Sequence, residues 1–396
     1  MDLEKEAREL LLRNRRRSGD HQYTIPSPNT YPYQWLWDSC FHAIVLAQFD
    51  PHFAKEELRS LVAKQFPDGM IPHIIFWKPR LATPYHLAWG SHGTSWITQP
   101  PMLAYAIWEI HRRAPDKAFL EEMYAPTLAF YRYFIEKRDP ENQHLCGIIN
   151  PDESGEDNSP RFDAPMKVNS AVSYARHLIL RHKLPNRIWN FQNDLSMKKD
   201  FWVKDVPFNV ILIRNLQALG HIASFLGHEV GEHFALQHEE LIKNAMREKL
   251  FSDGVFWSSM NGDDTPLRVA TWAHFAPLFA GLYTKEEADV LMEKHFRNAA
   301  TFRAPFGVRT VSKEEPSYRP HGTGFWRGPI WFAPHWFIYK GLCAYGYKDD
   351  AIFVRNANIE LIEQNGFREY FNPETGKGYG AKNFTWGTLT LDMMEQ

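Results

Sequence analysis

One segment of the sequence concentrates the residue types that general acid–base chemistry requires. It reads NPDESGEDNSPRFD, from Asn150 to Asp163, and its five carboxylates are Asp152, Glu153, Glu156, Asp157 and Asp163. Such a loop has three interpretations: a solvated turn, a metal site, or a place where one carboxyl group is kept protonated as a catalytic acid. The rest of the chain has to decide among them.

The metal interpretation fails on spacing. A calcium loop starting at Asp152 needs glycine at its sixth position, where Asp157 stands. GHEVGEH resembles a zinc-binding helix, but its histidines, His228 and His233, are five residues apart and cannot share one helix face. GTGFWRG, at 322–328, has the wrong spacing for a dinucleotide loop. We therefore expect neither a metal nor a cofactor.

Four other stretches combine aromatic and polar residues. They are YPYQWLWDSCFH (31–42), GSHGTSWITQPP (90–101), YRPHGTGFWRGPIWFAPHWF (318–337) and FREYFNPETGKGYGAKNFTWG (367–387). Trp and Tyr faces stack on sugar rings, and carboxylates accept hydrogen bonds from hydroxyls. The candidate ligand-binding residues in these stretches are Tyr33, Trp35, Trp37, Asp38, Gln99, Trp326, Arg327 and Trp331. Taken alone, Asp38 is more simply a first-turn carboxylate that stabilises a helix dipole, and the tryptophans are core residues.

Together these stretches resemble one enzyme family. The patterns ESGxDNSP (Glu153 to Pro160), WLWDS, FWRGPxW and EYFNPxTG are similar to those of the inverting α-glycosidases of glycoside hydrolase family 63. The nearest likeness is to the short members that hydrolyse mannosylglycerate or glucosylglycerate. The resemblance, which spans residues 31 to 389, implies that Asp157 is the general acid and Glu369 the general base. It also implies that Trp35, Trp37 and Asp38 hold the nonreducing sugar, while Gln99, Trp326 and Arg327 line the site.

This chemistry would explain the acidic loop. Inverting hydrolysis needs one protonated carboxyl group to release the leaving oxygen and one ionised carboxylate to activate water. Neighbouring carboxylates and burial both disfavour ionisation, so Asp157 could stay protonated near neutral pH. On this view Glu153 and Glu156 supply the negative field, and Asn158 and Ser159 orient the acid.

The aglycone is less well specified. The short members of the family place Tyr before the WRG motif, whereas this sequence has Phe325. A glycerate carboxylate would also need a cation or several donors, for which Arg161 and Arg187 are candidates. An α-glucosidase for short oligosaccharides is the alternative within the hydrolases. A sugar epimerase would use paired bases such as His42, His92, His274 and His321, and a binding protein without catalysis would not need both Asp157 and Glu369.

Composition excludes several other classes of function. The formal net charge is −2, and 15% of the residues are aromatic. No extended basic block or long apolar run occurs, so we expect neither nucleic acid nor a membrane as partner, but a small-molecule glycoside. The amino terminus lacks the apolar core of a signal peptide, and three scattered cysteines indicate reduced thiols and a cytoplasmic protein. A homo-oligomer is compatible with the sequence.

Helical periodicity dominates the elements that must position these residues. Asp50 and Pro51 begin one helix, whose apolar face includes Ala54, Leu58 and Leu61, and TKEE at 284–287 is a capping box that begins another. Further helices are predicted near 2–17, 36–49, 96–113, 117–137, 168–184, 203–226, 228–250, 268–282, 326–345, 348–365 and 383–394.

The connectors between the helices suggest the architecture. FPDGMIPHI, LCGIINPDESG, FSDGVFW and FREYFNPETGKGYG each join an aromatic or apolar patch to a Pro, Asp or Gly turn. Paired helices joined by such loops predict an all-α toroid of helical hairpins with its loops gathered at one end. No linker divides the chain, so we expect a single domain over residues 1–396. The family resemblance implies the same architecture, an (α/α)6 barrel.

Overall fold

The computed structural model describes residues 2–78, 93–167, 198 and 201–395, and helices dominate them. The α-helices are α1 (Leu3–Asn14), α2 (Leu36–Leu46), α3 (Pro51–Val62), α5 (Leu103–Arg113), α6 (Lys117–Lys137), α7 (Asp163–Met166), α11 (Val206–Leu226), α12 (Glu229–Lys249), α13 (Ala276–Phe279), α14 (Lys285–Leu291), α15 (Phe332–Ala344), α16 (Lys348–Asn365) and α17 (Leu389–Met394). Shorter helical turns are η1 (Pro151–Ser154), η2 (Pro160–Phe162), η4 (Trp272–His274), the π-helix η5 (Met292–Phe296) and η6 (Thr385–Thr388).

The strands are short and form small antiparallel sheets. They are β1 (Arg15–Ser18), β2 (His21–Thr24), β3 (Gln34–Trp35), β4 (Ile74–Ile75), β5 (Val203–Lys204), β6 (Phe251–Ser252), β7 (Val255–Phe256), β8 (Ser259–Met260), β9 (Thr265–Pro266), β10 (Arg303–Ala304), β11 (Gly307–Val308), β12 (Arg368–Phe371) and β13 (Gly378–Lys382). The pairs are β1–β2, β3–β4, β6–β7, β10–β11 and β12–β13, and β5, β8 and β9 form a three-stranded sheet. The described chain is thus mainly helical, as predicted.

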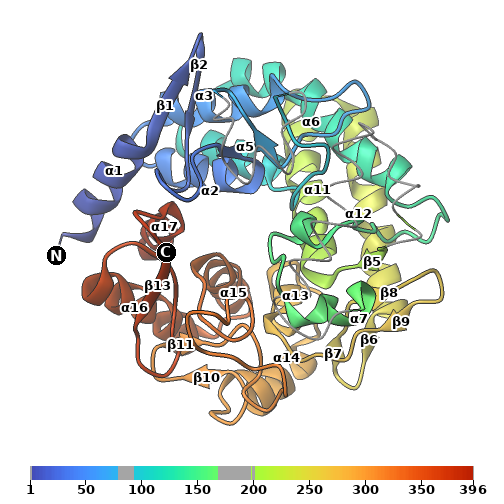
Figure 1. Ribbon diagram of the computed structural model, residues 1–396. Helices are drawn as coiled ribbons and strands as arrows, with labels where there is room; N and C mark the ends of the chain where they lie inside the picture. The colour runs from blue at the N-terminus through green and yellow to red at the C-terminus, as the bar shows by residue number, and fades with distance from the viewer. Residues whose placement is uncertain (1, 79–92, 168–197, 199–200, 396) are drawn as a thin grey trace.

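The helices form a ring in chain order (Figure 1). Consecutive helices pack as pairs, including α2 with α3, α11 with α12 and α15 with α16. The first member of a pair is buried far more completely than the second. All 11 residues of α2 are buried, whereas α12 buries only Gly231, Ala235, Ile242, Ala245 and Met246 along one face. The inner helices therefore pack on all sides, and the outer ones through one stripe.

Several predicted boundaries agree with the structure. The helices at 117–137 and 348–365 have the predicted ends. The Asp50 side chain accepts a hydrogen bond from the Phe53 N–H, with Pro51 in the first turn of α3. The capping box at Thr284 is present, with both of its reciprocal hydrogen bonds to Glu287.

Other predicted boundaries were wrong where proline, glycine or strand pairing competes with helix. The first helix ends at Asn14, and Arg15–Arg17 instead pair with β2 as a strand. Pro100 and Pro101 delay the helix expected at 96 until Leu103, and Gly328 and Pro329 delay the one expected at 326 until Phe332. Residues 268–282 form only η4 and α13, and 383–394 form η6 and α17. The helix predicted at 168–184 lies outside the described residues.

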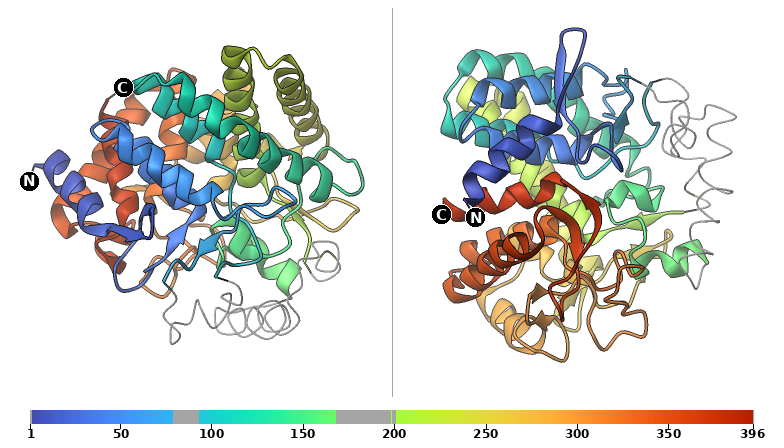
Figure 2. Two further views of the ribbon diagram at one scale, coloured as in Figure 1. Left: turned by 90° about the horizontal axis from the view of Figure 1, so that it is seen from above. Right: turned by 60° about the vertical axis from the view of Figure 1, so that its left-hand side comes forward.

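The segment that contains α7 and the chain termini lie at different ends of the ring (Figure 2). The two termini lie together at one end, and the segment that contains α7 lies at the other (Figure 2). The last elements meet the first, because α17 and η6 contact both α1 and α2. The ring therefore closes where the two ends of the chain meet.

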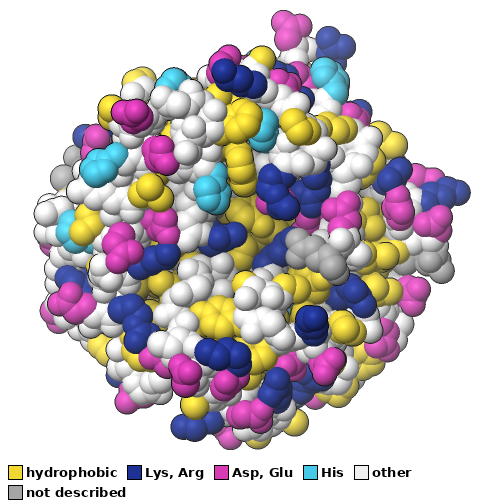
Figure 3. All heavy atoms as spheres, turned by 180° about the vertical axis from the view of Figure 1, so that it is seen from behind, with side chains coloured by type: hydrophobic (Ala, Val, Ile, Leu, Met, Phe, Trp, Pro, Cys, Tyr) yellow, Lys and Arg dark blue, Asp and Glu magenta, His cyan; other side chains and the backbone are white. Residues whose placement is uncertain are grey.

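The distribution of surface charge and the state of the cysteines agree with the composition of the sequence. Seen from behind, acidic and basic side chains are interspersed (Figure 3), in line with the formal charge of −2. No helix among the described ranges is both long and apolar enough to span a bilayer. Cys40, Cys146 and Cys343 are free thiols.

Candidate active site

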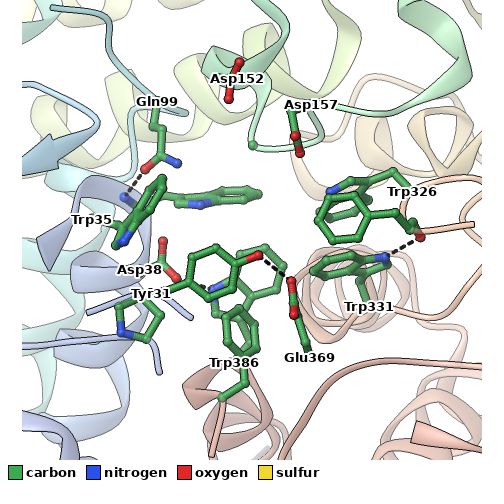
Figure 4. Close-up of a pocket in the computed structure, with 15 residues that line it drawn as sticks. Tyr31, Trp35, Asp38, Gln99, Asp152, Asp157, Trp326, Trp331, Glu369 and Trp386 are labelled. Carbon is green, nitrogen blue, oxygen red and sulfur yellow. Dashed lines mark hydrogen bonds between the residues drawn. The ribbon is translucent and has the colours of Figure 1, made fainter. Parts of the chain in front are cut away.

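A pocket of about 110 Å³ brings together residues that are far apart in the sequence. Its walls come from the segment before α2 and its first turn, from the acidic loop, from the turn before α15, and from the β12–β13 region (Figure 4). The lining residues are Pro26, Tyr31, Trp35, Trp37, Asp38, Gln99, Asp152, Gly155, Asp157, Phe325, Trp326, Trp331, Glu369, Phe384 and Trp386. The stretches singled out by their chemistry thus converge on one cavity.

The acidic loop reaches the pocket by packing against α2. Gly155 adopts a left-handed conformation, with φ of 73°. A Cβ atom there would lie 2.2 Å from Cζ2 of Trp37, so only glycine permits this approach. The close contact fixes the loop over the indole, and Asp157 follows two residues later with its carboxyl group directed into the cavity (Figure 4).

Most of the charge in this loop is neutralised by arginine. Arg138 donates two hydrogen bonds to Glu153, at 2.6 and 2.7 Å, and both side chains are fully buried. Arg161 pairs with Glu156 at 3.0 Å, and Arg327 pairs with Asp163 at 2.8 Å. The expectation that Glu153 supplies a negative field was therefore wrong, because Arg138 pairs with it alone. Glu156 shares Arg161 with Asp205, so two carboxylates face one cation there and that part of the expectation stays a prediction.

Two carboxylates of the loop line the pocket, Asp152 and Asp157. The Asn158 side-chain oxygen, expected to orient the acid, accepts a hydrogen bond from Arg327 Nε at 3.1 Å. The loop is thus held by ion pairs on its outer side and presents carboxyl groups on its inner side.

Glu369 lies across the pocket from Asp157, and their carboxyl groups point toward one another (Figure 4). It stands on β12, 2% exposed. Its Oε1 accepts a hydrogen bond from Tyr31 Oη at 2.6 Å, and its Oε2 accepts one from the Ala381 N–H at 2.6 Å. Burial raises the pKa of Glu369, and these two hydrogen bonds oppose that rise by stabilising the ionised form.

Asp38 occupies the first turn of α2 and also lines the pocket. Its Oδ1 accepts a hydrogen bond from Trp386 Nε1 at 2.6 Å. Burial raises the pKa of Asp38 to about 6, against the opposing effects of His42 and of the Trp386 hydrogen bond. A buried carboxylate at a cavity wall suits contact with ligand hydroxyls better than a dipole role alone.

Tryptophans form the remaining walls. The rings of Trp326 and Trp331 stack with centroids 4.0 Å apart and planes at 5°. Trp37 and Trp386 meet edge to face at 5.1 Å. The side-chain oxygen of Gln99 accepts a hydrogen bond from the Trp37 N–H at 3.4 Å. The cavity therefore combines flat apolar faces with a few carboxyl and amide groups, as carbohydrate sites do.

Two predicted site residues do not line the pocket. Tyr33 is 2% exposed and packs edge to face on Phe76 at 4.7 Å. Arg327 serves the loop through Asp163 and Asn158 instead. Neither contact could be read from local spacing.

The pocket is also lined by residues that had not been predicted to bind the ligand, chiefly Tyr31, Trp386 and Asp152, the last noted only as one carboxylate of the acidic loop. Tyr31 and Trp386 lie within the motif stretches, at the start of YPYQWLWD and inside NFTWG. Their place within these stretches was the only indication in the sequence that Tyr31 and Trp386 belong to the site.

The cation expected for a glycerate carboxylate is not supplied by Arg161, which is buried between Glu156 and Asp205. Arg187 lies outside the described residues. The described residues that line the pocket include no Lys, Arg or His. Within the described part of the chain, no group of three or more His, Cys, Asp or Glu side chains is arranged to hold a metal ion.

Comparison with known proteins identifies the family. The family model of the mannosylglycerate hydrolase MGH1-like glycoside hydrolase domain matches residues 31–387. The chain is 32% identical to a mannosylglycerate hydrolase of Thermus thermophilus, over 96% of this chain and 97% of that protein. It is 26% identical to a glucosylglycerate hydrolase of Mycolicibacterium hassiacum, over 92% of each.

The fold agrees as well. A crystal structure of a GH63 mannosylglycerate hydrolase from Thermus thermophilus, in complex with Tris and D-glycerate, superposes with a TM-score of 0.88 at 30% identity, over 99% of both chains. The predicted family resemblance is confirmed. Since the family model and the relatives cover nearly the whole chain, the protein belongs to the mannosylglycerate hydrolase MGH1-like glycoside hydrolases of family 63.

Proposed function

We propose that the protein is an inverting α-glycosidase whose first substrates to test are mannosylglycerate and glucosylglycerate. The observation that carries the proposal is the facing pair Asp157 and Glu369 in a pocket walled by tryptophans (Figure 4). The names of the relatives support the substrate class, since they hydrolyse mannosylglycerate or glucosylglycerate.

In this mechanism Asp157 is protonated and donates its proton to the glycosidic oxygen as the bond to the anomeric carbon breaks. Glu369 is ionised and removes a proton from a water molecule, whose oxygen attacks the anomeric carbon from the opposite face. The hydrogen bonds from Tyr31 and Ala381 favour the ionised form of Glu369, as a base requires. Attack from the face opposite the leaving group inverts the anomeric configuration.

The remaining pocket residues would hold the sugar. Asp38 would accept hydrogen bonds from two hydroxyls, and Gln99 would contribute an amide donor. Trp35, Trp37, Trp326 and Trp331 would pack against the faces of the ring. All of these side chains line the same cavity as Asp157 and Glu369.

The alternative activities fit the pocket less well. An epimerase would need proton-relaying bases, and no histidine is among the described residues that line the pocket. His42 is fully buried and bonded to Thr385 Oγ1 at 2.6 Å, and His92 lies outside the described residues. An α-glucosidase acting on short oligosaccharides would use the same acid and base, so only substrate tests separate it.

The proposal also includes the architecture of the chain. We infer an (α/α)6 barrel in a single domain over residues 1–396. The ring of helices (Figure 1) and the pairing of completely buried helices with amphipathic neighbours support it.

The experiment is hydrolysis of an α-glycoside panel, followed by proton NMR within the first minutes. The panel contains mannosylglycerate, glucosylglycerate, and maltose and trehalose as oligosaccharide controls. We expect mannosylglycerate and glucosylglycerate to be hydrolysed fastest, and the β-anomer of the released sugar to appear first. First-formed α-sugar would show retention and overturn the assigned roles, and preference for maltose would favour the α-glucosidase.

A further inference from the structure

The two ends of the chain are joined by hydrogen bonds beside the pocket. Asn14, which is fully buried, donates from Nδ2 to the Pro26 carbonyl at 3.4 Å and to the Asn383 carbonyl at 3.1 Å. The Ser27 hydroxyl donates to the Lys382 carbonyl at 3.0 Å. The Thr385 N–H donates to the Pro26 carbonyl at 3.0 Å. We call the contacts between residues 14–27 and 382–385 the terminal joint; the hydrogen bond from Asn14 to Pro26 lies within its amino-terminal side.

Each side of the terminal joint supplies one hydrogen-bond donor to Glu369. Tyr31 follows the joint on the amino-terminal side, and Ala381 precedes it on the carboxy-terminal side. Tyr31 and Ser27 are linked by an antiparallel bridge, and the Tyr31 ring lies 5.5 Å from that of Phe384. The distance between the two donors is therefore set by how the ends of the chain meet.

We propose that the terminal joint positions the catalytic base, and that Tyr31 is the positioning residue through which it acts. This inference rests on the proposed function, because it takes Glu369 as the base. Tyr31 would hold Oε1 of Glu369 at the pocket wall while the β13 backbone holds Oε2 from behind.

The geometry leaves the carboxylate little freedom to move. Each oxygen accepts one hydrogen bond of 2.6 Å. Gly380, with φ of 64°, leaves room for the carboxylate, because a Cβ atom there would lie 2.3 Å from Oε2. With both oxygens held, the remaining lone pair of Oε1 has a fixed direction relative to the cavity, as a general base needs.

Tyr31 also affects the pKa of Glu369. Burial raises the pKa of Glu369, and the charge of Asp38 acts in the same direction. The hydrogen bonds from Tyr31 and Ala381 and the charge of Arg368 oppose them. The hydroxyl of Tyr370, the next residue on β12, instead donates its hydrogen bond to the Gly322 carbonyl at 2.7 Å. Removing the Tyr31 hydroxyl should therefore favour protonated Glu369 and move the acid limb of activity to higher pH.

The first test is Tyr31→Phe, which removes one hydroxyl and keeps the ring. We expect kcat to fall about 10- to 100-fold, in line with the loss of a hydrogen bond to a charged group, with little change in KM. The acid limb of the kcat profile should move to higher pH. The matched control is Tyr370→Phe, which removes a hydroxyl one residue from Glu369 and should leave the acid limb in place. An unchanged acid limb in Tyr31→Phe, or the same shift in both variants, would overturn the proposal.

The second test addresses the terminal joint. Asn14→Ala and Ser27→Ala each remove joint hydrogen bonds and keep the Tyr31 hydroxyl. We expect a smaller fall in kcat with the same direction of shift, in whichever of the two variants retains the native circular dichroism spectrum. Each change should have less effect in a Tyr31→Phe background, because the hydroxyl through which the joint acts is gone. Fully additive effects would contradict the coupling.

Glu369→Gln separates this inference from the proposed function. An active Glu369→Gln variant would show that Glu369 is not the base, and the proposed function would fail. An inactive Glu369→Gln together with an unchanged Tyr31→Phe would leave the base assigned and reject only the role of the joint.

Discussion

The acidic loop and the β12–β13 hairpin face each other across the pocket, but they hold their carboxyl groups by opposite means. In the loop, three carboxylates are paired with the arginines Arg138, Arg161 and Arg327. In the hairpin, Glu369 is held by two uncharged donors, a phenol and a backbone amide. Ion pairs fix the loop as a scaffold, whereas neutral hydrogen bonds hold Glu369 without cancelling its charge.

This difference matters because acid and base need opposite protonation states. A cation beside Asp157 would favour its ionised form and remove the proton that it must donate. Among the described residues, Arg138, Arg161 and Arg327 pair with Glu153, Glu156 and Asp163. The number of acidic residues in the loop is thus a poor guide to its electrostatics, since most of them are structural.

The largest effect should follow from Asp157→Asn. The amide keeps the shape but cannot donate the proton, so kcat should fall by at least ~100-fold. A substrate with an activated leaving group should recover part of the loss, because that group needs less protonation. Asp152→Asn, which changes the other pocket-facing carboxylate of the loop, is the matched control and should lose much less. Near-normal turnover of an unactivated glycoside by Asp157→Asn would refute the assignment.

The next effect concerns the scaffold. Glu153→Gln leaves the fully buried Arg138 without its counter-ion, and breaking a buried pair typically costs about 3–5 kcal/mol of unfolding free energy. The exposed pair Arg268–Asp253 is the comparison, and Asp253→Asn should cost less than about 1 kcal/mol. Urea denaturation measures both. Equal losses in the two variants would mean that the loop is not held by its ion pairs.

A smaller and more selective effect is expected at Asp38. Asp38→Asn should lower kcat/KM, because each charge-assisted hydrogen bond to a hydroxyl contributes about 1.5–3 kcal/mol. With its pKa raised to about 6, the wild-type carboxylate is protonated below that pH, so sugar binding should weaken there.

Stability should move the other way at Asp38. A raised pKa means that its ionised form disfavours folding, so its contribution to stability is present at low pH and is lost as the pH rises toward about 6. Asp38→Asn should therefore not lower Tm at pH 7. Unchanged kcat/KM with a lower Tm would restore the interpretation of Asp38 as a helix-dipole residue.

Features of the fold that depend on neighbouring residues could be predicted from the sequence, whereas features that depend on residues far apart in the chain could not. Local signals worked where they act alone: Asp50 and Pro51 begin α3, and Thr284 begins α14. They misled at Arg15–Arg17, where pairing with β2 overrides the helix pattern. The stretches that line the pocket were recognisable because aromatic and polar residues occur together in each.

Partners across the ring were not predictable from spacing. Tyr31 and Glu369 are 338 residues apart in the chain, and Trp386 and Asp38 are 348 apart. The arginine partner of Glu153 was equally hidden, although it is only 15 residues away, because it lies at the end of α6. The sequence thus indicated which stretches carry residues suited to the site, and the fold decides which of those residues line the pocket and which are neutralised.

The smallest effect is expected from removal of metal ions, which should change nothing. This test addresses whether the acidic loop is a metal site. Because Glu153, Glu156 and Asp163 are engaged by arginines, two of the loop's five carboxylates, Asp152 and Asp157, are left facing the pocket, fewer oxygen ligands than a calcium site uses. Exhaustive EDTA treatment should therefore leave kcat and Tm unchanged. Glu153→Gln offers a sharper version, because a calcium loop would lose affinity for the ion, whereas an arginine-held loop loses stability with or without calcium. Activity that disappears with EDTA and returns with added Ca²⁺ would show that the loop holds an ion, and that the contrast with the hairpin is one of metal binding instead of ion pairing.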